Sequence, residues 1–226
     1  MKKLFIHHHL GLGDHFVCNA LVRHVVETSN FDEYVLVTKK HNIPTVEQMY
    51  CDLTNLKLFS VETDSGFYDK INQNGEILRI GFENLNRLKT FDVSFYEQLN
   101  IPFEYKKEKF KVCRNKDKED KCFDFYSPPQ DYIFVHSNAS DKNFSLKLET
   151  DLPIISPVGY DFTLIDYLKL IENANEIHCI DSSFMNMIDL SVEHDNMFFH
   201  DCRSLVGGIA PTLVNKWKTI SYGDEK

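Results

Sequence analysis

The first third of the chain alternates short β-branched runs with longer runs at helical spacing, and this order constrains the fold most. Residues 4–8 predict a buried strand, and residues 14–28 carry apolar side chains at helical spacing. A strand at 34–37, a helix beginning at Pro44 and a strand at 56–61 follow. Because parallel strands need crossover connections, this β-α-β-α-β order predicts a parallel sheet with right-handed crossovers.

The same pattern restarts after a polar break. Residues 114–130 contain a run of mixed charge and the helix-breaking Ser127-Pro128-Pro129, which together predict a linker. Further strands are predicted at 77–80, 132–136, 152–155, 176–180 and 197–200, with helical segments at 95–99, 165–174 and 184–191. We therefore expect an α/β protein with Rossmann-like domains at 1–113 and 131–226.

The composition is that of a globular protein with an acidic surface. The 226 residues are 42% hydrophobic and include 18 Phe, enough for a substantial core. With 25 Lys and Arg against 34 Asp and Glu, the net charge is 25 − 34 = −9, so the chain lacks the basic field of most nucleic-acid binders. The basic stretch from Lys106 to Lys111 is interrupted by acidic residues and is interpreted as a solvated loop or edge strand.

The cysteines and apolar runs bear on the compartment. No two of the six cysteines have C-x-x-C spacing, and Cys18 and Cys179 lie in apolar patterns where reduced cysteine acts as a small hydrophobe. The apolar run at 4–6 is too short for a signal peptide, and no run approaches the ~20 residues of a membrane span. We expect a cytoplasmic protein without a membrane span.

Three consecutive histidines follow the first predicted strand. Alternate strand residues face opposite sides, so His7 and His9 are expected to share a face. Without a plausible carboxylate or cysteine partner they are weak evidence for a metal, and packing at the strand end or ligand contact is preferred. We expect no metal or cofactor, although a metallohydrolase using His7, His9 and Asp14 stays open as an alternative.

Three polar loops follow predicted strands, at 9–15, 136–141 and 181–184. In open α/β sheets, ligands bind at the carboxyl ends of strands, and the amino ends of the following helices favour phosphates. In the first loop, Gly11 and Gly13 let backbone approach a ligand. Asp14 is either a helix N-cap or a catalytic carboxylate near an acceptor hydroxyl.

The other two loops also leave alternatives open. Ser182 and Ser183 could hold a phosphate or sugar, or Asp181 or Ser182 could cap a helix. His136 and Ser140 could contact the same ligand, although a satisfied histidine at a strand end explains His136 equally well. The sequence has no full G-x-G-x-x-G fingerprint, P-loop or G-x-S-x-G elbow, which disfavours dinucleotide-binding, Walker-type and Ser-His-Asp sites.

In combination, two of these loops resemble a known group of enzymes. The strand–Gly11-Leu12-Gly13-Asp14–helix unit resembles the opening of glycosyltransferases related to the ADP-heptose:lipopolysaccharide heptosyltransferases. Residues 167–189, with Glu176-Ile177-His178-Cys179-Ile180-Asp181-Ser182-Ser183-Phe184, resemble the donor-side strand–Asp-Ser/Thr–helix unit of that group and of fucosyltransferase-like enzymes. The resemblance implies a GT-B fold, with two Rossmann-like domains facing across a cleft and the nucleotide sugar held mainly by the second.

The resemblance also implies roles for individual residues. Asp14 corresponds to the general base for the acceptor, with Gly11 and Gly13 near the donor phosphates. The donor side comprises Asp181, Ser182 and Ser183, with His136 and Ser140 at the diphosphate and Lys142 as the nearest cation for the leaving group. The chain is short for this fold, so each domain must be trimmed.

These observations predict a metal-independent glycosyltransferase. It would move a sugar from a nucleotide-diphosphate donor to a hydroxyl of a glycan or related acceptor. The alternative is a non-catalytic α/β module that binds a nucleotide or glycan without transferring it.

Overall fold

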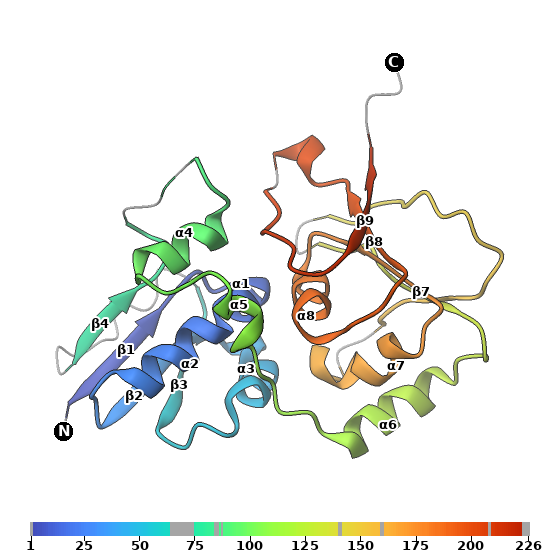
Figure 1. The fold of residues 1–226 in the computed structure, drawn as a ribbon. Coiled ribbons are helices and arrows are strands. Elements are labelled where there is room, and N and C mark those ends of the chain that lie inside the picture. The colour runs from blue at the N-terminus through green and yellow to red at the C-terminus, as the bar shows by residue number, and fades with distance from the viewer. Residues whose placement is uncertain are drawn as a thin grey trace. The chain divides into compact units, whose positions relative to one another are not determined.

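The computed structural model describes residues 2–63, 75–83, 86, 88–139, 142–158, 161–207 and 209–222. The chain divides into two compact units, Met1–Cys113 and Arg114–Lys226. Each unit is a mixed α/β fold built on its own parallel sheet. Figure 1 draws the first unit in blue to green and the second in yellow-green to red.

The sheet of the first unit has four strands in the order β3-β2-β1-β4, all parallel. Their bounds are β1 Lys3–His7, β2 Glu33–Lys39, β3 Leu56–Val61 and β4 Glu76–Arg79. Leu4 of β1 lies opposite Tyr34 on one side and Glu76 on the other. The strand order reverses at β1, so the carboxyl ends of β1 and β4 form a topological switch point.

The helix predicted over 14–28 is present as two segments joined at Cys18. The helical segments of this unit are α1 Leu12–Val17, α2 Asn19–Thr28, η1 Lys40–Asn42, α3 Ile43–Tyr50, α4 Phe91–Gln98 and α5 Tyr105–Glu108. The Cys18 N–H donates to the Asp14 carbonyl at 2.8 Å, and the Val22 N–H donates to the Cys18 carbonyl at 2.9 Å. Both bonds have α-helical spacing, so hydrogen bonding continues through the junction.

The second unit has five parallel strands in the order β6-β5-β7-β8-β9. The strands are β5 Ile133–His136, β6 Ile154–Ile155, β7 Glu176–Ile180, β8 Met197–Asp201 and β9 Trp217–Ser221. The helical segments are α6 Lys116–Tyr126, η3 Leu164–Tyr167, α7 Leu168–Glu172, α8 Ser183–Ser191 and η4 Ser204–Val206. Here the order reverses at β5, which places the switch point at the ends of β5 and β7.

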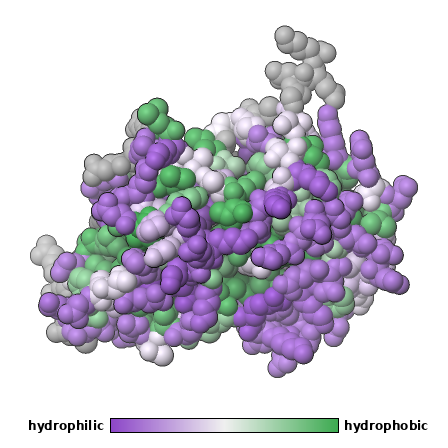
Figure 2. Space-filling model, viewed as in Figure 1, coloured by the Kyte–Doolittle hydropathy of each residue, from purple (hydrophilic) through white to green (hydrophobic). Residues whose placement is uncertain are grey.

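Each sheet carries its own apolar core. In the first unit, Phe5, Leu10, Val35, Val37 and Val61 form one buried cluster. In the second, helix α8 buries Phe184, whose ring centroid lies 5.7 Å from that of Phe134 and 5.3 Å from that of Tyr167. Hydrophilic residues cover much of the face visible in Figure 2, as the acidic composition predicts.

The segment predicted as a linker contains a helix instead. The side chain of Asn115 caps α6 by accepting the Lys118 N–H at 3.1 Å, and the Lys169 ammonium pairs with Asp120 at 2.6 Å. Cys122 is fully buried on one face of this helix. Because charged residues dominate this segment, the sequence pattern does not indicate the one buried face of the helix. Ser127, with a left-handed φ of 41°, ends the helix at the predicted break.

Cys51 and Cys113 form a disulfide, whereas Cys18 and Cys179 are free and buried, as their apolar patterns predict. The Cys113 N–H also donates to the Gln48 carbonyl at 2.9 Å. The two cysteines are 62 residues apart in the sequence, and no local spacing indicates their pairing. Disulfides are typical of oxidising compartments, so the cysteines do not support a cytoplasmic location. Within the described residues, no helix is both long and apolar enough to cross a membrane.

Candidate functional site

Asp14 lies inside the first helix rather than at its cap. Gly11 is the N-cap of α1, with extended backbone (φ −65°, ψ 145°), and Asp14 is the third helical residue. The N-cap alternative for Asp14 is therefore wrong. A Cβ on Gly11 would lie 2.5 Å from Oδ2 of Asp14, so the carboxylate lies over the Gly11 backbone. This half-buried carboxylate sits at the positive end of the helix dipole, directly after β1.

Aromatic rings join the carboxyl ends of β1 and β4. The rings of His7 and His9 each stack on Phe82 with centroids 4.8 Å apart, which confirms that the two histidines share a face. Nε2 of His9 lies 2.9 Å from the Gly81 carbonyl oxygen. The Arg79 guanidinium lies 4.9 Å from the Phe82 ring centroid and pairs with Glu83. Sequence reasoning missed Arg79, Gly81 and Phe82, because no motif marks the end of β4.

Two further histidines, one before and one after the Gly11–Asp14 turn, are buried in the core of this unit. The rings of His8 and His15 are fully buried, with centroids 4.4 Å apart. Nε2 of His15 lies 3.1 Å from Oγ1 of Thr38. Burial lowers the pKa of His8 to about 4 and holds the pKa of His15 well below its usual value. Both rings are therefore neutral near pH 7, and they support the turn without adding charge to it.

A fully buried ion pair also belongs to this unit. Nζ of Lys106, on α5, lies 2.8 Å from Oδ2 of Asp92, on α4, and the side chains are 1% and 0% exposed. The interpretation of the stretch from Lys106 to Lys111 as a solvated loop or edge strand is wrong for Lys106. Helix α5 packs against α2, and the Lys106 ammonium also lies 5.5 Å from the Phe103 ring centroid.

In the second unit, His136 and Ser182 join the ends of β5 and β7. Oγ of Ser182 accepts the Met185 N–H at 3.4 Å, which makes Ser182 the N-cap of α8. The same oxygen lies 3.0 Å from Nδ1 of His136. Burial lowers the pKa of His136 to about 4, so the ring is neutral near pH 7. If the Ser182 hydroxyl donates to Nδ1, the ring hydrogen is on Nε2.

Asp181 and Arg203 add charge beside this hydrogen bond. Nη1 of Arg203 donates to the Asp181 carbonyl oxygen at 3.1 Å and lies 3.4 Å from its carboxylate. Burial raises the pKa of Asp181, and the positive charge of Arg203 acts in the opposite direction. Ser183 follows as the first residue of α8. The sequence analysis missed Arg203, which is 22 residues from Asp181 and has no motif of its own.

The remaining donor-side residues lie on the loop after β5. Lys142 is exposed, and its ammonium lies 5.2 Å from the Phe144 ring centroid. Its carbonyl accepts the Ala139 N–H at 2.8 Å. Ser140 lies outside the described residues. Arg203, rather than Lys142, is thus the cation that contacts the predicted Asp181 site.

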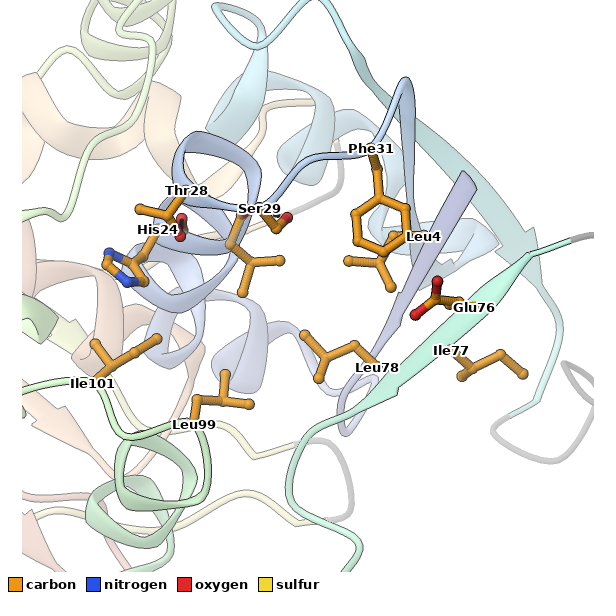
Figure 3. A pocket seen from close by; sticks show the side chains of 11 residues that line it. Leu4, His24, Thr28, Ser29, Phe31, Glu76, Ile77, Leu78, Leu99 and Ile101 are labelled. Carbon is orange, nitrogen blue, oxygen red and sulfur yellow. Dashed lines mark hydrogen bonds between the residues drawn. The ribbon is translucent and has the colours of Figure 1, made fainter. Parts of the chain in front are cut away.

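A hollow of about 360 Å³ in the first unit lies elsewhere (Figure 3). Its lining includes Leu4, His24, Thr28, Leu78, Leu99 and Ile101, from β1, α2, β4 and the segment after α4. Leu4 is near the amino end of β1, whereas Asp14 follows the carboxyl end. This hollow is therefore not the predicted site. In the part of the chain that the structure describes, no group of three or more His, Cys, Asp or Glu is arranged to hold a metal ion.

The fold is similar to that of a solved protein described as glycosyl transferase family 9 from Veillonella parvula DSM 2008. The likeness covers 100% of this chain and 88% of the other, with a TM-score of 0.61 and 10% sequence identity. At that identity it shows the fold alone, and it agrees with the α/β fold with parallel sheets predicted from the sequence. No family model matches the chain. No curated protein matches it either.

Proposed function

We propose that the protein is a glycosyltransferase that moves a sugar from a nucleotide-diphosphate donor to a hydroxyl of a glycan or related acceptor. The observation that carries this proposal is the carboxylate of Asp14, placed over Gly11 at the first strand-to-helix turn of a fold similar to a family 9 glycosyl transferase. The proposal includes the GT-B arrangement implied by the resemblance, in which one domain serves the acceptor and the other the donor.

Asp14 is assigned the general base. Glycosyl transfer needs a group that takes the proton from the acceptor hydroxyl as its oxygen bonds to the anomeric carbon. A carboxylate at the amino end of a helix is stabilised in its charged form by the helix dipole, and this favours the ionised state that a base requires. The backbone at Gly11 and Gly13 is assigned to the donor phosphates, because glycines permit close approach.

The donor side is assigned to the second unit. The N–H groups at the start of α8, with Ser183, are suited to phosphate oxygens. A neutral His136 with hydrogen on Nε2 can donate to the same anion. Arg203 supplies positive charge for the leaving diphosphate, which a metal-independent transferase requires. Lys142 is assigned an outer contact of this site.

The test compares the wild-type chain with the Asp14→Asn variant. Thermal-shift measurements with UDP, GDP, ADP and CDP identify the nucleotide, and release of nucleoside diphosphate from matching sugar donors measures turnover. We expect Asp14→Asn to retain nucleotide binding and to lose about 10²- to 10⁴-fold in kcat. Asp117→Asn, at an exposed acidic position in the first turn of α6, is the matched control and should keep wild-type kcat.

Two outcomes would contradict the proposal. Full turnover in a folded Asp14→Asn protein would remove Asp14 as the base. Nucleotide binding without donor hydrolysis or transfer on any acceptor would favour the non-catalytic binding module instead.

A further inference from the structure

A buried chain of hydrogen bonds crosses the second sheet from β7 to the residue that follows β9. Nε2 of His178 lies 2.9 Å from Oε2 of Glu176, and Nδ1 of His178 lies 2.9 Å from Nε2 of His200. Nδ1 of His200 lies 2.7 Å from the Tyr222 hydroxyl oxygen. His178 and His200 are 4% and 0% exposed. Neither histidine belongs to the proposed donor site, so the chain has no role in the proposed reaction.

The chain ends on the segment that joins β5 to β6. Residues 142–153 of this segment, which we call the strap, contain no helix and no strand. The Lys147 N–H, on the strap, donates to the Tyr222 hydroxyl oxygen at 2.8 Å, and the Lys147 ammonium lies 5.8 Å from the Tyr222 ring centroid. Lys147 is itself exposed, so its N–H can exchange with water when that bond opens.

One assignment of hydrogens satisfies every bond in this chain. A backbone N–H can only donate, so Tyr222 accepts from Lys147 and gives its own hydrogen to Nδ1 of His200. In a neutral ring the remaining hydrogen is then on Nε2, which donates to Nδ1 of His178. The hydrogen of His178 is likewise on Nε2 and donates to the carboxylate of Glu176. Every donor therefore points the same way, from the strap to Glu176, while both rings are neutral.

One added proton reverses that direction. The proton binds Nδ1 of His200, the Nε2 hydrogen of that ring moves to Nδ1 of His178, and the positive charge rests beside Glu176. The Tyr222 oxygen then receives N–H groups from both His200 and the strap. Its own hydrogen is left with the sulfur of Cys202, a weak acceptor, so the hydroxyl binds the strap less well.

Charged and titratable groups from each neighbouring element act on the two rings. Burial lowers the pKa of His200 to about 4, and it also lowers the pKa of His178, which Glu176 raises in part. The Lys218 ammonium lies 4.9 Å from the Phe198 ring centroid, and that ring stacks on His178 with centroids 4.5 Å apart. The full set is Glu176 on β7, Asp201 and Cys202 at the end of β8, Lys218 on β9, Tyr222 after β9 and Lys147 on the strap. The rings are therefore neutral near pH 7 and take up a proton in acid.

We propose that this chain is an acid-sensitive latch for the strap: while both rings are neutral the Tyr222 hydroxyl holds the Lys147 backbone, and one proton shared by the two histidines loosens that bond. The inference goes beyond the proposed function, because it concerns the mobility of the strap and not the transfer of a sugar. The strap also carries Lys142, so the latch acts on the segment that holds this exposed cation.

Amide hydrogen exchange of the full chain tests the latch without turnover. The rate for an unprotected amide divided by the measured rate, at the same pH, gives the protection factor of the Lys147 N–H. We expect this factor to fall about fivefold between pH 7 and 4.5, the size expected for the loss of one hydrogen bond. Val158 is the internal reference, because its N–H donates to the Tyr126 hydroxyl oxygen at 2.7 Å. Among the described residues no histidine bonds to that hydroxyl, so the Val158 factor should stay constant.

Three substitutions assign the acid response to the chain. In His200→Asn, the amide oxygen can accept the Tyr222 hydrogen but does not titrate, so Lys147 should stay protected at pH 7 and lose its acid response. Tyr222→Phe removes the hydroxyl and should abolish the protection of Lys147 at both pH values. Tyr126→Phe is the matched control, since it removes a hydroxyl that also accepts a backbone N–H. It should leave both the protection and the acid response of Lys147 unchanged.

Three outcomes of the exchange experiment would overturn the latch. They are a constant protection factor at Lys147, an equal loss at Lys147 and Val158, and an acid response that persists in His200→Asn. Nitrogen-15 NMR of the histidine rings in the wild-type chain is a second measurement that needs no variant to fold. At pH 7 both His178 and His200 should carry hydrogen on Nε2, and hydrogen on Nδ1 of either ring would contradict the chain. Neither measurement involves turnover, so the latch and the proposed function can fail separately.

Discussion

The two sheets end differently at their switch points. The ends of β1 and β4 are joined by stacked rings, with His7 and His9 on Phe82. Asp14 lies in the turn after β1, and Arg79 pairs with Glu83 at the end of β4. The ends of β5 and β7 are joined by a hydrogen bond between Oγ of Ser182 and Nδ1 of His136, with the cation of Arg203 alongside. The first end thus combines Asp14 with stacked rings, whereas the second combines the Asp181–Arg203 pair with a hydrogen bond between two side chains.

This difference separates two chemical tasks. A carboxylate at a packed aromatic turn is suited to taking a proton, whereas a cation beside a helix N-terminus is suited to holding an anion. The proposed division into acceptor and donor units depends on that contrast. Three measurements would sharpen or break it.

The largest expected effect concerns a feature of both ends, because each has a buried histidine. Burial lowers the pKa of His8 and of His136 to about 4, from an ordinary value near 6.5. Between these values the unfolded chain binds protons that the folded chain does not, so stability falls as the pH drops from 6.5 to 4 and is retained above 6.5. Each histidine accounts for roughly 3 kcal/mol of that loss.

Urea unfolding between pH 7 and 4.5 checks this expectation. His8→Asn and His136→Asn should each reduce the pH dependence of the unfolding free energy. An unchanged slope in one variant alone would show that the two ends bury their histidines to different extents in solution. Unchanged slopes in both would contradict the expectation for each end.

The next effect tests how tightly the aromatic end is packed. Gly81 has φ +85°, and a Cβ there would lie 2.5 Å from the Phe95 ring and 2.8 Å from His9. Gly81→Ala should lower the free energy of unfolding by about 2–4 kcal/mol, because left-handed strain adds to overpacking. Gly207, in the second unit, has φ +81° with nothing within 4 Å of its Cβ.

Gly207 therefore provides the matched control for strain alone. Gly207→Ala should cost about 1 kcal/mol in the same denaturation experiment. Equal losses of unfolding free energy in the two variants would mean that the side chains around Gly81 shift easily to admit a methyl group. The contrast between a tightly packed end and an open one would then be wrong.

The smallest effect concerns the polar end. Ser182→Ala removes the N-cap of α8 and the hydrogen bond to His136, and should cost about 1 kcal/mol of stability. It should also weaken binding of the nucleotide identified by thermal shift. Ser183→Ala is the matched control for the cap, since Ser183 is already inside the helix. A larger stability loss for Ser183→Ala than for Ser182→Ala would contradict the assigned cap.

The sequence predicted the elements whose pattern is local. The apolar run at 176–180 coincides with β7, and Pro44 lies in the first turn of α3 as expected. Strand β9 went unpredicted because distant contacts hold it. The carboxylate of Asp189, on α8, accepts the Val214 N–H and the Trp217 Nε1–H, each at 2.9 Å. Partners 25 and 28 residues apart leave no periodic signal near the strand.

The candidate site divides in the same way. Asp14 and Ser182 could be proposed from the sequence because each lies in or just after the polar turn between an apolar strand and a helix. Arg203 depends on the side-by-side pairing of β7 and β8, which sequence spacing does not reveal. Lys106 lies in a run of charges typical of a surface, and its buried pairing with Asp92 on α4 is a tertiary contact that such a run does not indicate.

The disulfide between Cys51 and Cys113 has a topological consequence for the first unit. It closes the intervening chain into a covalent ring that includes β3, β4, α4 and α5. Hydrolysis of one peptide bond in that ring, for example after the exposed Lys89, would open the ring without releasing a fragment. Asp92 and Lys106 would stay covalently attached to the Asp14 helix after such a cut, and only reduction would let the pieces separate.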